Sequence, residues 1–82
     1  MTIDQLIPLT NGLSVNACAQ TLAVERARVT RVTDRAIDLS FRIAGTDFAP
    51  RFTLPRRRLA STTFEDLIVM VRRVAANAVG CS

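Results

Sequence analysis

The chain has 82 residues, enough for one small hydrophobic core and too few for a second domain, so we expect a single domain over residues 1–82. Its hydrophobic fraction of 49% and charged fraction of 22% are typical of a globular protein and exclude a disordered chain. All eleven basic residues are arginine, and the net charge of +4 favours a polyanionic or acidic partner.

The N-terminal third of the sequence predicts two short helices. Thr2 with Gln5 is typical of a capping box and predicts a helix that runs through Leu9. Ser14 is a helix-capping residue type and predicts a second helix over residues 15–22. We therefore expect helical structure before the first strand.

Residues 25–33 are compatible with a strand or a helix, and the functional hypothesis depends on which forms. The segment is rich in β-branched residues, which favours a third strand at about residues 26–33. Because Val29 then falls on the polar face, the strand requires a bulge. As a strand, the segment pairs Val32 with Ile37 and Arg31 with Asp38.

As a helix, the same segment places Arg28, Arg31 and Arg35 on one side at spacings of three and four. The apolar residues of this region resemble the skeleton of a helix-turn-helix: Ala19, Leu22, Ala23, Val24, Val29 and Val32. The resemblance covers about twenty residues and implies a recognition helix for duplex DNA. It also makes the following hairpin similar to the wing of a winged helix, with Arg42, Arg51 and the arginines at 56–58 near phosphates.

The middle of the chain predicts an antiparallel hairpin over residues 36–43 and 48–54. Apolar and polar residues alternate in both segments, and residues 44–47 form the loop. Pro50 cannot donate a hydrogen bond to a neighbouring strand, so the second segment should lie at the sheet edge. The register that keeps all inward pairs apolar matches Ile43 with Phe48, Phe41 with Pro50, Leu39 with Phe52 and Ile37 with Leu54.

Residues 62–79 predict an amphipathic C-terminal helix that packs on the sheet, which makes the fold class α+β. Thr62 with Glu65 is typical of a capping box, and Gly80 is placed to end the helix. Val69 and Met70 lie beside the main apolar stripe. We expect either that the N-terminal helices cover these two residues or that they form a self-association surface for a homodimer.

The chain lacks residues that much of enzyme and metal chemistry requires. Histidine, lysine, tyrosine and tryptophan are absent, so we expect no enzyme, no metal site and no cofactor. The N-terminus, with Asp4 and Pro8, predicts neither a signal peptide nor a membrane span. We therefore expect a cytoplasmic protein with reduced cysteines, the alternative being a disulfide between Cys18 and Cys81.

Arginine clustering provides the functional hypothesis. We hypothesise a non-enzymatic module that binds nucleic acid, specifically duplex DNA, through arginine–phosphate contacts from Arg28, Arg31, Arg35, Arg56, Arg57 and Arg58. The alternative is a compact protein-binding module or inhibitor, of the type carried by phages and other mobile elements, that recognises an acidic protein surface. A strand at residues 25–33 removes the helix-turn-helix argument and favours this alternative.

Overall fold

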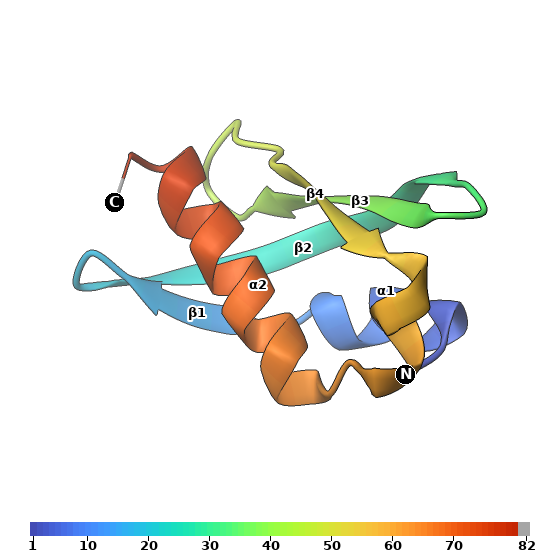
Figure 1. Ribbon diagram of the computed structural model, residues 1–82. Coiled ribbons are helices and arrows are strands. Elements are labelled where there is room, and N and C mark those ends of the chain that lie inside the picture. The colour runs from blue at the N-terminus through green and yellow to red at the C-terminus, as the bar shows by residue number, and fades with distance from the viewer. Residues whose placement is uncertain (81–82) are drawn as a thin grey trace.

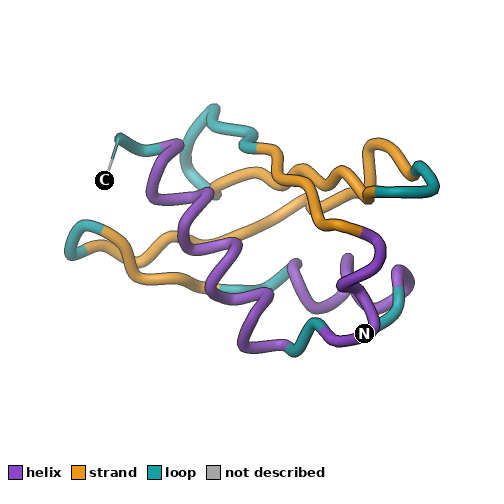
Figure 2. The backbone as a smooth tube through the Cα atoms, viewed as in Figure 1, coloured by secondary structure: helices purple, strands orange, loops and turns teal. Residues whose placement is uncertain are grey.

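An N-terminal helix, a four-stranded antiparallel sheet and a C-terminal helix follow one another along the chain (Figures 1 and 2) in the computed structural model, which describes residues 1–80. The strand order is β1-β2-β3-β4, and each strand is antiparallel to its neighbour. This architecture confirms the predicted α+β class. The elements are α1 (Ile3–Thr10), β1 (Ser14–Ala17), β2 (Gln20–Val32), β3 (Ala36–Ile43), β4 (Arg51–Pro55), the 3-10 helix η1 (Arg56–Ser61) and α2 (Phe64–Ala78).

The first helix forms where the sequence predicts it. The Thr2–Gln5 capping box is present, and the Thr2 amide donates to Gln5 Oε1 at 2.9 Å. Asn11 follows the helix and ties it to the sheet, because its Oδ1 accepts a hydrogen bond from the Ala27 amide at 2.8 Å. Among the helices of residues 1–80, none combines the length and apolar character that crossing a membrane would need.

The predicted helix over residues 15–22 is wrong, because this segment forms the β1–β2 hairpin. Cys18 and Ala19 form its two-residue turn and both have left-handed backbone conformations, with φ of 52° and 61°. Such turns match the twist of the flanking strands. Val15 and Leu22 are buried opposite one another, so the pairing of two strands outweighs the local helix signal.

The cysteine at the hairpin turn is not a free thiol. Cys18 is disulfide-bonded, so the expected reduced state of this residue is wrong. Cys81 lies outside the described residues.

Residues 25–32 belong to strand β2, which confirms the favoured interpretation and removes the helix-turn-helix resemblance. β2 pairs Val32 with Ile37 and Arg31 with Asp38, as predicted, and the register shifts between Val29 and Arg31. Within residues 1–80, Arg31 and Asp38 form no ion pair. Instead, Asp38 Oδ1 accepts a hydrogen bond from the Thr53 hydroxyl at 2.7 Å.

The β3–β4 pairing has the predicted register, with Leu39 opposite Phe52 and β4 at the sheet edge. β4 begins at Arg51 rather than at residue 48, although the Ile43 amide still donates to the Phe48 carbonyl at 3.2 Å. The predicted core position of Phe48 is wrong, since its side chain is 47% exposed. It lies in the loop before β4, outside the regular strand geometry that would direct it inward.

The C-terminal helix α2 is confirmed, but its cap lies one residue later than predicted. Thr63 Oγ1 accepts from the Asp66 amide at 3.1 Å, and the Thr63 amide donates to Asp66 Oδ2 at 3.0 Å. Thr62 instead ends η1, and its buried hydroxyl donates to the Arg58 carbonyl at 2.8 Å. The preceding 3-10 helix therefore displaces the start of α2.

This cap predicts a specific stability difference. Thr63→Ala should lower the free energy of unfolding by about 1 kcal/mol, because the first turn of α2 loses a hydrogen-bond acceptor. Glu65→Asp is the control, since it keeps a negative charge in the first turn and should change stability by less than about 0.5 kcal/mol. Urea unfolding followed by circular dichroism measures both, and equal losses would contradict this assignment of the cap.

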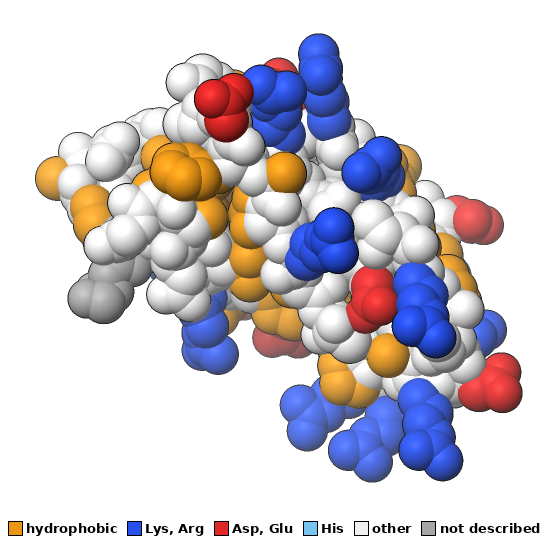
Figure 3. All heavy atoms as spheres, turned by 90° about the horizontal axis from the view of Figure 1, so that it is seen from above, with side chains coloured by type: hydrophobic (Ala, Val, Ile, Leu, Met, Phe, Trp, Pro, Cys, Tyr) orange, Lys and Arg blue, Asp and Glu red, His pale blue; other side chains and the backbone are white. Residues whose placement is uncertain are grey.

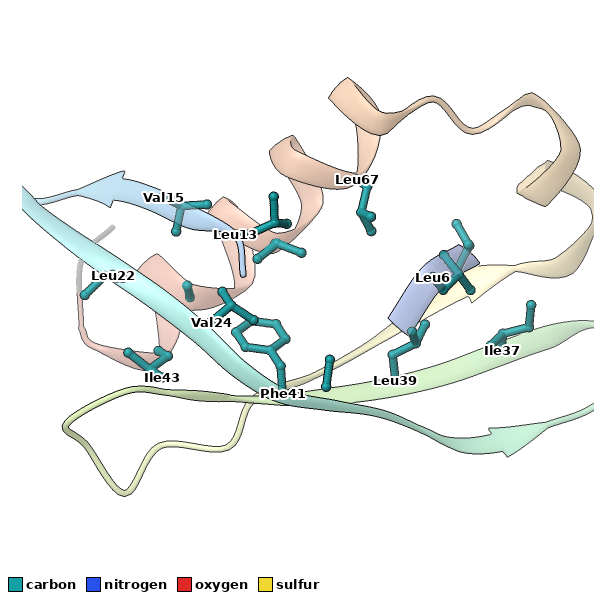
Figure 4. Packing of buried hydrophobic residues seen from close by; sticks show 14 residues of the cluster. Leu6, Leu13, Val15, Leu22, Val24, Ile37, Leu39, Phe41, Ile43 and Leu67 are labelled. Atoms are coloured by element: carbon teal, nitrogen blue, oxygen red, sulfur yellow. The ribbon is translucent and has the colours of Figure 1, made fainter. Parts of the chain in front are cut away.

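The core lies between one face of the sheet and the two helices. Figure 4 shows the sheet side chains pointing toward α2, from which Leu67 enters the same cluster, while Leu6 joins it from α1. Both helices lie on this side of the sheet (Figure 1). Within residues 1–80, the opposite face of β2, β3 and β4 carries no helix, and we call it the open face. The most deeply buried core side chains are Leu6, Val15, Ile37, Leu39, Phe41, Ile43, Leu67 and Val71.

Candidate functional site

The centre of the open face is a row of three residues across three strands. Arg28 of β2 lies opposite Ser40 of β3, and Ser40 lies opposite Arg51 of β4. Directly opposed residues of an antiparallel sheet project to the same face, so two exposed arginines flank one serine. Arg28 Nε donates to Ser40 Oγ at 3.4 Å, and Ser40 is only 7% exposed.

The rows on either side combine arginine with acid. Arg31 lies opposite Asp38, and Glu25 lies opposite Arg42. Arg42 is anchored at the end of the face, because its Nε donates to the Thr46 carbonyl at 3.2 Å and its Nη2 lies 3.6 Å from Asp47 Oδ1. The face is therefore basic but interrupted by carboxylates. Figure 3, which views the molecule from above, shows arginines with acidic side chains among them.

Three arginines converge on a hollow of about 240 Å³ in the open face, which we call the arginine hollow. Arg26 reaches it from the first register shift of β2, where its backbone is left-handed with φ of 53°. Guanidinium groups present forked donors that match the two oxygens of a carboxylate or phosphate. The lining residues are Arg26, Arg28, Ser40, Phe41, Arg42 and Ala49.

A second basic group lies where the β2–β3 turn meets the start of η1, and we call Arg35, Arg56 and Arg57 the turn group. The Arg56 amide donates to the Arg35 carbonyl at 2.9 Å, and Arg56 Nη1 donates to the Thr33 carbonyl at 3.1 Å. A hollow of about 520 Å³ is lined by Arg35 and Arg57 together with Pro55 and one acid, Asp34.

The structure divides the arginines that the sequence singles out. Arg28 and Arg31 lie on the open face, whereas Arg35, Arg56 and Arg57 form the turn group. Arg58 follows Arg57 in η1 but lines a different hollow, which it shares with Met70 and Asp66. The arginines that the sequence treats as one set therefore lie partly on the open face and partly on η1 and the β2–β3 turn.

The candidate set from the sequence left out three arginines of the open face, Arg26, Arg42 and Arg51, although the helix-turn-helix alternative placed Arg42 and Arg51 near phosphates. The signal for Arg51 was present, because the predicted register places it opposite Ser40. Arg26 gives no such signal, since only the bulge turns it toward the hollow. The two self-association candidates also separate: Val69 is 51% exposed, whereas Met70 packs against the core.

Comparison with known proteins leaves the function to be argued from this site. Neither a family model, nor a curated protein, nor a solved structure matches the chain. Within residues 1–80, no cluster of three histidine, cysteine or acidic side chains has the arrangement to hold a metal ion.

The left-handed backbone at Arg26 predicts that a substitution there changes the free energy of unfolding. Arg26→Gly should raise the free energy of unfolding by about 0.5–1 kcal/mol, because glycine adopts the left-handed backbone without the steric cost of a Cβ. Arg31→Gly, on the same strand but without a positive φ, should lower it by about 0.5–1 kcal/mol. Urea unfolding distinguishes the two, and destabilisation by both variants would contradict strain at Arg26.

Proposed function

We propose that this protein is a non-enzymatic binding module that recognises an acidic protein surface through its open face. The observation that carries the proposal is that three strands place five arginines on one face without a covering helix: Arg26, Arg28, Arg31, Arg42 and Arg51. Among the described residues, only Arg42 of these five has a carboxylate within 4.0 Å. The other four guanidinium groups are available to carboxylates of a partner.

The shape of the face favours a protein partner over a DNA groove. Residues 20–32 form a strand within a sheet, so the helix that would enter a major groove does not exist. Glu25 and Asp38 interrupt the arginines and would repel an evenly charged phosphate chain. A protein surface, in contrast, can offer donors and acceptors to both signs of charge.

An exposed aromatic residue next to the arginine hollow supports the same partner class. Phe48 is 47% exposed, and its neighbour Ala49 lines the hollow. Protein–protein interfaces are enriched in arginine and aromatic residues, which supply most of their binding energy. We therefore expect a partner carboxylate in the arginine hollow and an apolar partner side chain against Phe48.

The turn group favours a second candidate, which is contact with the backbone of duplex DNA. Its three arginines have one nearby acid, Asp34, and project at one end of the molecule. Three phosphate contacts predict that the logarithm of DNA affinity falls with the logarithm of salt concentration with a slope of about −3. No base readout is expected from this arrangement.

The two candidates are separated by one pair of measurements on the full chain. Immobilised protein should capture a protein partner after nuclease treatment, and Arg28→Ala/Arg51→Ala should release it. Titration with a duplex oligonucleotide at several salt concentrations tests the second candidate, for which Arg56→Ala/Arg57→Ala should lower the affinity and reduce the slope. Nuclease-sensitive capture alone would contradict the first candidate, and absence of both activities would contradict both.

A further inference from the structure

The exposed side of α2 carries acids at one end and arginines at the other. Glu65 and Asp66 lie in the first turn, Val69 follows, and Arg72 and Arg73 come after it. With 3.6 residues per turn, these five residues share the side of the helix opposite the core-facing residues. All five are exposed, and Val69 at 51% is the most exposed large hydrophobic residue among those described.

These charges have no ion-pair partner within the described part of the chain. Along α2 the acids and arginines are separated by six to eight residues, beyond the three or four that allow pairing on one helix. The single ion pair found within residues 1–80 joins Arg42 to Asp47, far from this surface. The side of α2 therefore presents two acids, then Val69, then two arginines, and none of these charges has an ion-pair partner within residues 1–80.

A groove lies beside this stripe, between α2 and the edge strand β1. Its volume is about 340 Å³, and Val69 lines it together with Asn16 and Ala17 of β1. Arg72 and Arg73 border the same groove. An apolar centre with charged borders is the usual layout of a protein interface.

We propose that two copies of this chain associate through α2 in an antiparallel arrangement, with the two-fold axis passing at Val69. A two-fold axis perpendicular to two antiparallel helices places each residue opposite one equally distant from the axis on the other side. Glu65 and Asp66 precede Val69 by four and three residues, and Arg72 and Arg73 follow it by three and four. The acids of each copy therefore face the arginines of the other.

The charge order selects this arrangement over its alternative. In a parallel pair, acids would face acids and arginines would face arginines, and both contacts would be repulsive. In the antiparallel pair, both ends attract, and the two Val69 side chains exclude water between them. The charges along α2 are therefore complementary to those of a second, antiparallel copy of the same helix.

Such a dimer would leave the proposed binding face free. α2 and the open face lie on opposite sides of the sheet (Figure 1), so association through α2 does not cover the arginine hollow. Each dimer would present two open faces, and a partner with two acidic sites would gain affinity from their linkage. This association does not depend on the identity of that partner.

Analytical ultracentrifugation of the full chain over a range of concentrations tests the proposal. We expect a reversible monomer–dimer equilibrium that weakens by about tenfold or more for Val69→Asp, since two carboxylates would meet at the axis. Glu65→Arg and Arg73→Glu, which change two residues that face one another across the axis, should each weaken self-association, and mixing these two variants should restore a dimer. This restoration requires the opposing contact and cannot arise from a folding defect.

The matched control is Val32→Asp, which places the same charge on a residue of similar exposure, 46%, in β2. It should leave the monomer–dimer equilibrium unchanged. Circular dichroism of each variant establishes that the fold is retained. A chain that stays monomeric at about 1 mM, or a dimer that Val69→Asp leaves intact, would overturn the proposal.

Discussion

Replacing Phe41 by alanine should lower the free energy of unfolding by about 3–5 kcal/mol. Phe41 is 1% exposed and lies at the centre of the cluster between the sheet and α2 (Figure 4). Its ring meets Phe52 edge to face, with centroids 6.0 Å apart and an interplanar angle of 62°. The substitution removes this contact and leaves a cavity that a small core cannot readily close.

This loss is large relative to the whole stability of such a domain. A domain of this length has a stability of roughly 4–12 kcal/mol, so Phe41→Ala should remove a quarter of it or more. Because tryptophan and tyrosine are absent, far-ultraviolet circular dichroism during urea unfolding is the suitable measurement. Phe48→Ala is the control and should change stability by less than about 0.5 kcal/mol, since Phe48 is 47% exposed.

An unexpected change in stability at either Phe41 or Phe48 would contradict the placement of that side chain. A small effect at Phe41 would contradict its position in the core. A large effect at Phe48 would indicate that the loop before β4 packs onto the protein, as the pattern of alternating residues had suggested. The pair therefore tests the one aromatic position at which sequence pattern and structure disagree in the β3–β4 hairpin.

Reversing the charge of two arginines on the open face should reduce affinity for the protein partner by at least about 100-fold. Arg28→Glu/Arg51→Glu removes both guanidinium groups beside Ser40 and puts carboxylates where the partner's own carboxylates are expected. Both side chains are exposed and neither forms an ion pair in the described chain, so the fold should be retained. Surface plasmon resonance with the captured partner measures the change.

The comparison variant is Arg57→Glu/Arg58→Glu, which makes the same change in net charge at η1. It should alter affinity for the protein partner by no more than about threefold, because long-range charge affects association modestly at physiological salt. Equal losses from both variants would show that only overall charge matters and would remove the open face as a specific site. A loss confined to the η1 variant would place the partner at that end of the molecule.

Several elements of this fold follow from local sequence pattern. Alternation in the segments that became β3 and β4 predicts both strands and the pairing of Leu39 with Phe52, because a one-residue slip would move every apolar side chain out of the core. The same logic predicts the bulge near Val29. The C-terminal helix follows from spacing of three and four, with an error of one residue at its cap.

Other elements depended on contacts that helix spacing and capping patterns do not reveal. The segment that forms β1 has helix-compatible spacing, and only its partner strand makes it extended. The cap of α2 moved to Thr63 because η1 uses Thr62 to complete its own hydrogen bonds. In each case the local signal was weak, and a contact made elsewhere determined the outcome.

Composition and local pattern by themselves determined a small basic α+β domain with an edge strand, a C-terminal helix and more arginines than acids. The tertiary structure alone decided which arginines act together. Arg28 and Arg51 are distant in sequence, and they meet across Ser40 because antiparallel pairing places opposed residues on one face. Arg26 joins them only through a left-handed bulge. Local pattern specifies which residues avoid water, whereas a charged site depends on register, which nonlocal pairing sets.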